Sequence, residues 1–147
     1  MSSHSFTAAS PVPPTLPGRR VRPTNDFIEF RNEEVEQSVP ARFEEQVRRH
    51  STRLAVKTPG EALTYDALNR AANRVASAIL ARRRETGAEP VALLLEQGAQ
   101  AIAAMLGVLK AGKIHVGLDP AHPRARTDLA LENAQPGLLV TPATSTW

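Results

Sequence analysis

The sequence contains no cysteine among its 147 residues. Disulfides, a thiol nucleophile and cysteine-ligated metals are therefore excluded, and the composition suits a reducing compartment. Long apolar runs are missing as well, because no stretch approaches the roughly 20 consecutive apolar residues that a membrane-spanning helix needs. The N-terminus also lacks the basic-then-apolar order of a secretory signal. The sequence therefore predicts a cytoplasmic protein without a membrane partner.

Acidic residues are absent from the first 25 positions, where Arg19, Arg20 and Arg22 lie. All 15 acidic residues of the chain lie at or after Asp26, together with the other 15 of its 18 lysines and arginines. The net charge of +3 and the pI of about 9.9 therefore belong to the N-terminal segment. A neutral body argues against a nucleic-acid partner, which would need a basic surface.

The same N-terminal segment has few large apolar residues and holds five of the twelve prolines. Such a composition cannot bury enough surface to offset the entropy of ordering, so we expect residues 1–25 to form a disordered tail. A transit peptide is the alternative for an acid-poor segment, but prolines would break its amphipathic helix. Residues 26–147 are long enough for one domain with its own core, with order beginning near Phe27.

In this body, helical and strand periodicities alternate, which predicts a doubly wound α/β layer around a mostly parallel sheet. Caps mark the first two helices, at Ser38 and at Thr64. The expected helices cover 38–50, 99–111 and 123–133, together with one that begins at 64 and ends near the arginines at 82–84. The expected strands cover 54–57, 62–64, 91–96, 114–118 and 138–141. The residues expected to face the core are Val39, Phe43, Val47, Leu68, Ala71, Ala72, Val75, Ala76, Ile79, Leu80, Ile102, Met105, Leu106 and Leu109.

One stretch resembles a phosphate-binding loop. Residues 107–113 satisfy the first seven positions of G-x-x-x-x-G-K-[ST], but the eighth is Ile114, which has no hydroxyl for magnesium. A phosphate loop also needs a strand before it and a helix after it. Here a helix precedes and a strand follows, so we expect a structural turn, with Gly112 ending the helix.

Three other groups of residues could carry chemistry, and each also has a structural interpretation. His115, Asp119 and His122 are the only cluster of metal-capable side chains, but Asp119 before Pro120 is typical of an aspartate that holds its own turn. The arginines at 82–84 could bind phosphate, although a solvated helix end is the preferred interpretation. A triad can be drawn from His50, Ser51 and Asp66, but no nucleophile-elbow pattern accompanies it.

Two motifs resemble those of a known family. Residues 63–69 (LTYDALN) with 72–76 (ANRVA) resemble the first core motif of amino-acid adenylation domains of nonribosomal peptide synthetases, within the adenylate-forming, AMP-binding superfamily. Residues 109–120 (LKAGKIHVGLDP) resemble the second core motif, and 123–126 (PRAR) resembles the P-x-x-R that follows it. The resemblance runs from about Phe27 to Thr141 and identifies an N-terminal fragment of such a domain.

The resemblance implies ATP-dependent activation of an amino or other carboxylic acid to an acyl-adenylate, usually followed by transfer to a carrier-protein thiol. In the family, ATP and magnesium are held by a Ser/Thr/Gly-rich loop with a lysine, by a ribose-binding aspartate and by a lysine of a C-terminal lid. None of these matches a position here, so we assign no catalytic, cofactor-binding or metal-binding residue. The expected function is a ligase part that is inactive alone. The alternative is a non-catalytic module that pairs with a partner, such as the remainder of a synthetase, through an exposed sheet edge.

Several positions depart from the family pattern. Ala67 stands where glutamate is common, which removes half of a capping box and costs about 0.5–1 kcal/mol. Ile114, His115 and Gly117 replace the usual Ala, Tyr and Pro, and Thr127 stands where Leu is frequent. These changes are expected to weaken packing. The expected sheet also lacks some of its strands, so residues 91–95 and the helix around Ile102 should be only partly covered. Together with the substitutions, this predicts marginal stability.

Overall fold

The computed structural model describes residues 32–83 and 87–142. The predicted disordered tail over residues 1–25 and the expected start of order near Phe27 lie outside this part of the chain. The described elements are η1 (Asn32–Glu36), α1 (Val39–His50), β1 (Leu54–Lys57), β2 (Ala62–Thr64), α2 (Tyr65–Arg82), β3 (Pro90–Leu94), α3 (Ala99–Lys110), β4 (Ile114–Leu118), α4 (Arg124–Ala134) and β5 (Leu138–Val140). Among them, no helix has both the length and the apolar character needed to cross a membrane.

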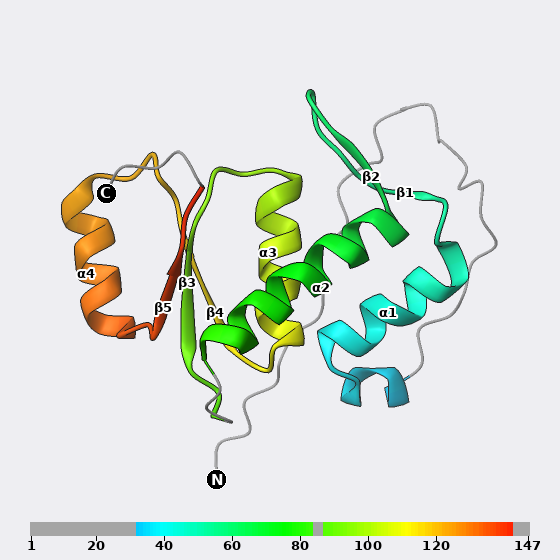
Figure 1. The fold of residues 1–147 in the computed structure, drawn as a ribbon, viewed down its shortest axis with the longest axis horizontal. Coiled ribbons are helices and arrows are strands. Elements are labelled where there is room, and N and C mark those ends of the chain that lie inside the picture. The colour runs from blue at the N-terminus through cyan, green and yellow to red at the C-terminus, as the bar shows by residue number, and fades with distance from the viewer. Residues whose placement is uncertain (1–31, 84–86, 143–147) are drawn as a thin grey trace, which may run out of the picture. The chain divides into compact units, whose positions relative to one another are not determined.

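The predicted α/β layer is confirmed (Figure 1). β3, β4 and β5 form a parallel sheet in the order β4–β3–β5, so the chain crosses over β3 between its last two strands. α2 and α3 pack on one face of this sheet and α4 lies on the other. The predicted hairpin of β1 and β2 forms a separate antiparallel pair that leads directly into α2.

Both predicted helix caps are confirmed. The Ser38 hydroxyl accepts a hydrogen bond from the Ala41 amide at 3.3 Å, and the Thr64 hydroxyl accepts one from the Ala67 amide at 3.2 Å. Each bond satisfies one of the amides that an α-helix leaves unpaired in its first turn. The caps define where α1 and α2 begin. Because Thr64 is also the last residue of β2, its cap sets the direction in which the chain turns from the hairpin into α2.

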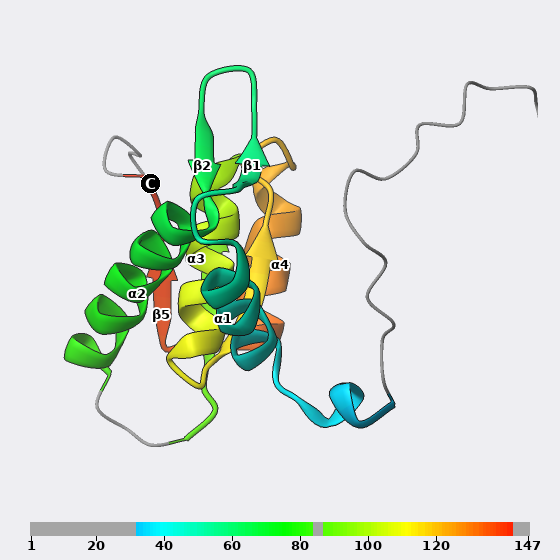
Figure 2. The ribbon, with the colours of Figure 1, turned by 90° about the vertical axis from the view of Figure 1, so that its right-hand side faces the viewer.

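The core has two clusters, one on each side of the α2–α3 pair. The first joins Ile79 and Val108 to Val91 and Leu93 of β3, and so attaches both helices to the sheet. The second joins Leu68 and other residues of α2 and α3 to partly buried side chains of α1 and the hairpin, which lie on the side away from the sheet (Figures 1 and 2). The helix pair is therefore the middle layer.

α2 and α3 approach each other closely through small residues. A Cβ built on Gly107 would lie 2.6 Å from Cβ of Val75 and 2.8 Å from the carbonyl oxygen of Ala72. Of α3, the residues buried are Ala99, Ala103, Ala104, Leu106, Gly107 and Val108. The predicted core face of this helix was therefore only partly right, because Ile102, Met105 and Leu109 are half-buried, whereas small residues make up most of its buried positions.

Two other residues predicted to face the core are exposed instead. Val39 is 60% exposed and Leu80 is 47% exposed, and both line an open groove between α1, α2 and α3. Periodicity correctly gave the apolar stripe of each helix, but it cannot tell how far along the stripe the neighbouring helix extends.

The expectation that β3 is only partly covered was wrong. Val91, Ala92, Leu93 and Leu94 are each at most 3% exposed, so both faces of this strand are buried. The exposed apolar side chains of the sheet lie on its two outer strands, where Ile114 of β4 and Leu139 of β5 remain in contact with solvent. A parallel sheet normally has both faces covered, and here the cover is complete only over its central strand.

Candidate functional site

The turn between α3 and β4 is built as a helix end. Gly112 has φ +68°, a left-handed conformation that favours glycine. Its amide donates to the Leu109 carbonyl at 3.1 Å, and the Lys113 amide donates to the Val108 carbonyl at 3.1 Å. These two bonds form a Schellman motif. Both amides that a phosphate loop would direct at an anion therefore point back into the helix, which confirms the structural turn.

The lysine of the phosphate-loop pattern is buried at the amino end of the sheet. Lys113 is 4% exposed, and its Nζ donates to the Gly87 carbonyl at 2.8 Å and lies 3.3 Å from Oε2 of Glu89. The Glu89 carboxylate also accepts from Arg83, at 2.7 Å from Nη2 and 3.2 Å from Nε. Because these groups are engaged with one another, this turn does not fit an ATP phosphate.

We call Arg83, Glu89 and Lys113 the amino-edge network. It joins the end of α2 to the starts of β3 and β4, and the Glu89 carbonyl accepts from the Ile114 amide at 2.9 Å. The Arg83 guanidinium also packs on Gly137, where a Cβ would meet its Nη2 at 2.7 Å. The expectation of a solvated arginine end was therefore wrong for Arg83, while Arg82 donates to the Ala78 carbonyl and Arg84 lies outside the described residues.

The predicted role of Asp119 is confirmed. Its Oδ1 accepts from the Ala121 amide at 2.9 Å, which closes an aspartate turn after β4. His122 is exposed beyond this turn, whereas His115 is half-buried on β4, with its imidazole beside Gly117. The described part of the chain contains no group of three or more metal-capable side chains placed to hold one ion.

The triad drawn from His50, Ser51 and Asp66 has no catalytic arrangement. The Asp66 carboxylate pairs with Arg70 one turn later on α2. The His50 ring lies 6.4 Å from the Tyr65 ring, and Ser51 is the C-terminal cap of α1, with its carbonyl accepting from the Asp66 amide. These residues join α1 to α2.

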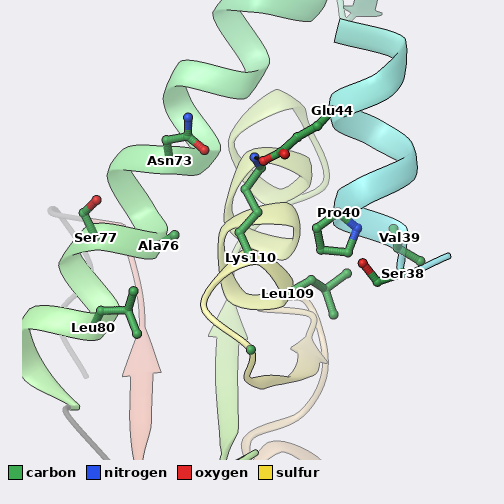
Figure 3. Close-up of a pocket in the computed structure, with 11 residues that line it drawn as sticks. Ser38, Val39, Pro40, Glu44, Asn73, Ala76, Ser77, Leu80, Leu109 and Lys110 are labelled. Carbon is green, nitrogen blue, oxygen red and sulfur yellow. Dashed lines mark hydrogen bonds and ion pairs between the residues drawn. The ribbon is translucent and has the colours of Figure 1, made fainter. Parts of the chain in front are cut away.

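The open groove between α1, α2 and α3 has a volume of about 850 Å³ (Figure 3). Among its lining residues, the Lys110 ammonium pairs with Glu44 of α1, and it lies 6.0 Å from the centre of the Phe43 ring. The Lys110 side chain is only 6% exposed, so its charge is paired and largely removed from water. The contact attaches α3 to α1.

Sequence reasoning had missed both lysine contacts and the pair between Glu34 and Arg42. No partner was predicted for Lys110, and Lys113 was considered only as part of the phosphate-loop pattern. The signal for Lys113 was its place between a helix-ending glycine and an apolar strand, where a charge requires a partner. Glu34 of η1 accepts from Arg42 Nη2 at 2.8 Å, and this hydrogen bond, with help from Glu45, raises the pKa of Arg42.

The described strands and helices thus form part of a parallel α/β scaffold. The two sequence motifs, at residues 63–76 and 109–120, make structural contacts within it. The model of the AMP-binding enzyme family matches residues 43–147, so the chain belongs to that family.

Its relatives include nonribosomal peptide synthetases. Gramicidin S synthase 2 of Brevibacillus brevis is 35% identical over 119 residues, which are 78% of this chain and 3% of that protein. Novobiocin biosynthesis protein H of Streptomyces niveus is 39% identical over 102 residues, which are 67% of this chain and 16% of that protein. The chain therefore spans only a small part of the relatives it matches.

Solved structures agree with this assignment. The nonribosomal peptide synthetase FmoA3, in an AMPPNP-bound form, superposes with a TM-score of 0.67 at 34% identity, over 72% of this chain and 11% of that one. The N-terminal subdomain of Klebsiella oxytoca NpsA superposes with a TM-score of 0.65 at 23% identity, which shows the common fold, over 74% of this chain and 28% of that one.

Proposed function

We propose that this chain is the N-terminal part of the adenylation domain of an ATP-dependent ligase, and that it contributes scaffold without catalysing adenylation alone. The observation that carries the proposal is the α3–β4 turn, since the motif most like a phosphate loop uses its amides and its lysine for internal contacts. Family membership supports the reaction class, which is activation of an amino or other carboxylic acid to an acyl-adenylate.

ATP and magnesium would then be held by other parts of the complete ligase. Phosphoryl chemistry of this kind needs donors and a metal around the phosphates, and neither core motif described above supplies them. A carrier protein is the corresponding acyl acceptor. One structural neighbour is a synthetase protein that contains adenylation and carrier domains, which supports this choice of partner.

Amino-acid-dependent exchange between ATP and pyrophosphate tests the proposal. The pure chain is expected to show exchange at the level of a protein-free control for every amino acid supplied. As a positive control, an intact adenylation domain of gramicidin S synthase 2 should exchange under the same conditions. ATP–pyrophosphate exchange by the pure chain that depends on one particular amino acid would contradict the proposal.

A second candidate function is a non-catalytic interaction or complementation module. It is favoured by one observation, that the outer sides of β4 and β5 have no strand partner in the described part of the chain. Such edges accept a strand from another polypeptide. Co-purification with a synthetase that lacks the corresponding segment is the expected result, and failure to form a complex would count against this function.

A further inference from the structure

Side-chain amines are scarce in this chain. Of its 18 basic residues, only three are lysines, at positions 57, 110 and 113, and the other 15 are arginines. The two kinds of residue differ in chemistry, because a lysine amine can lose its proton and act as a nucleophile, whereas an arginine guanidinium stays protonated. A reagent that is attacked by amines therefore has at most three side chains of this kind to react with.

Two of the three lysines are shielded by the fold. The Lys110 side chain is 6% exposed, and its ammonium pairs with Glu44. The Lys113 side chain is 2% exposed, and its Nζ donates to the Gly87 carbonyl at 2.8 Å and lies 3.3 Å from Oε2 of Glu89. Charge-assisted contacts of this kind have to break before the amine can reach a reagent, so both lysines should react slowly.

The third lysine, Lys57, is exposed at the end of β1. Within residues 32–83 and 87–142, no ion pair engages its ammonium. Its backbone is held in place, because Lys57 pairs with Ala62 across the hairpin and the Thr58 amide donates to the Glu61 carbonyl at 2.8 Å. The hairpin projects beyond α2 in Figure 1. The fold therefore presents this one amine to solvent on an ordered hairpin.

The turn of this hairpin lies beside the carboxyl end of β3. Residues 58–61 of the turn and residues 95–100 of the β3–α3 loop line a common hollow of about 580 Å³. In open α/β sheets, ligands bind outside the carboxyl ends of the strands, where the strand order reverses, and here β4 and β5 follow on opposite sides of β3. Lys57 directly precedes the turn, so an acyl compound released at this edge of the sheet would meet its amine.

We propose that Lys57 is a site of acylation by the acyl-adenylate that the complete ligase forms. The inference rests on the proposed function, which supplies this mixed anhydride of a carboxylic acid and AMP. In the reaction, the neutral Nζ attacks the acyl carbon, and an amide bond forms as the bond from that carbon to the phosphate oxygen breaks. AMP leaves with the electron pair, and the amine proton passes to water. Acylation removes the positive charge of Lys57.

Acetyl-adenylate added to the pure 147-residue chain tests this site. Mass spectrometry of peptides follows acetylation at each lysine, with the N-terminal amine as the internal standard. In the folded chain, Lys57 is expected to react at least tenfold faster than Lys110 and Lys113. In concentrated urea, where burial and pairing are lost, the three rates should lie within about threefold of one another, because unperturbed lysines share one reference pKa.

Lys57→Arg and Lys110→Arg form a matched pair of variants, because each removes one amine and keeps the positive charge. Lys57→Arg is expected to lower side-chain acetylation of the folded chain at least fivefold, and Lys110→Arg to change it less than twofold. Equal rates at the three lysines of the folded chain would overturn the proposal. A larger yield on histidine or hydroxyl side chains than on Lys57 would overturn it too.

The experiment separates this inference from the proposed function. Acetyl-adenylate is supplied ready-made, so selective acetylation of Lys57 does not require the chain to take part in adenylation. ATP–pyrophosphate exchange is measured on the same preparation. Exchange by the pure chain would contradict the proposed function and leave the acylation site standing, whereas failure of Lys57 to react in the absence of exchange would overturn the acylation site alone.

Discussion

The two faces of the parallel sheet are built to different degrees. On the face of α2 and α3, both helices share a buried core cluster with β3, and a glycine lets the two helices approach closely. On the face of α4, the helix buries one threonine and leaves Leu129 exposed. Both faces are covered over β3, but the helix layer is a packed pair on one side and a single, mostly exposed helix on the other.

This difference separates the contacts that stabilise the isolated chain from the face that remains available to the rest of a larger domain. The α2–α3 face holds most of the core packing, so substitutions there should cost much stability. The α4 face contributes little to that packing, so substitutions there should be nearly neutral in the isolated chain. The predictions below test this contrast, beginning with the largest effect.

Glu89→Gln should cost about 3 kcal/mol of unfolding free energy, because it removes the carboxylate that faces the buried Lys113. Chemical denaturation measures it. Glu132→Gln, at an exposed position of α4, is the matched control and should change the free energy by less than about 0.5 kcal/mol. Equal effects of the two variants would show that the amino-edge network does not contribute to stability.

Gly107→Ala should cost about 2 kcal/mol, because its Cβ would overlap Val75 and the backbone of Ala72. The gain in helix propensity, about 1 kcal/mol, offsets part of a larger steric cost. Gly98→Ala is the control, since a Cβ there meets nothing within 4 Å. The thermal midpoint of each variant checks the expectation, and an unchanged midpoint for Gly107→Ala would contradict the close approach of α2 and α3.

Thr64→Ala should cost about 1 kcal/mol through loss of the cap on α2. Thr64→Ser keeps a hydroxyl that can accept from the Ala67 amide, and it should retain most of the stability. Urea titration followed by circular dichroism compares the two variants. If both lose the same amount, the effect comes from packing of the threonine methyl group and the cap is of no consequence.

Leu129→Ala should have the smallest effect, less than about 0.5 kcal/mol, because this side chain of α4 is mostly in solvent. Leu106→Ala, in the buried layer between α2 and α3, should by contrast cost about 3 kcal/mol. Denaturant midpoints measured in parallel give the ratio. A large loss for Leu129→Ala would show that α4 is packed more tightly than its exposure indicates.

Local sequence signals predicted most of the elements. The caps at Ser38 and Thr64, the glycine at 112 and the alternation in β4 depend on neighbours along the chain, and the structure confirms each of them. The order β4–β3–β5 could not be read in this way, because strand order is set by crossovers. The exposure of Val39 and Leu80 could not be read either, because it depends on where other helices end.

For the candidate site, the sequence correctly predicted what residues 107–113 do not form. Element order alone ruled out a phosphate loop at residues 107–113, and the helix-ending bonds of Gly112 and Lys113 agree with it. The partner of Lys113, however, lies 24 residues earlier at Glu89, and no spacing rule connects the two. Long-range ion pairs of this kind depend on the register of strands that meet only in the folded state.

Hydrogen exchange of the pure 147-residue chain, read at single amides, tests the difference between the two faces most directly. We expect slow exchange throughout α2 and α3 and exchange at least a hundredfold faster in α4, because protection follows local packing. Equal protection of α4 and α2 would show that the two helix layers are packed equally well, and it would contradict the difference between the two faces.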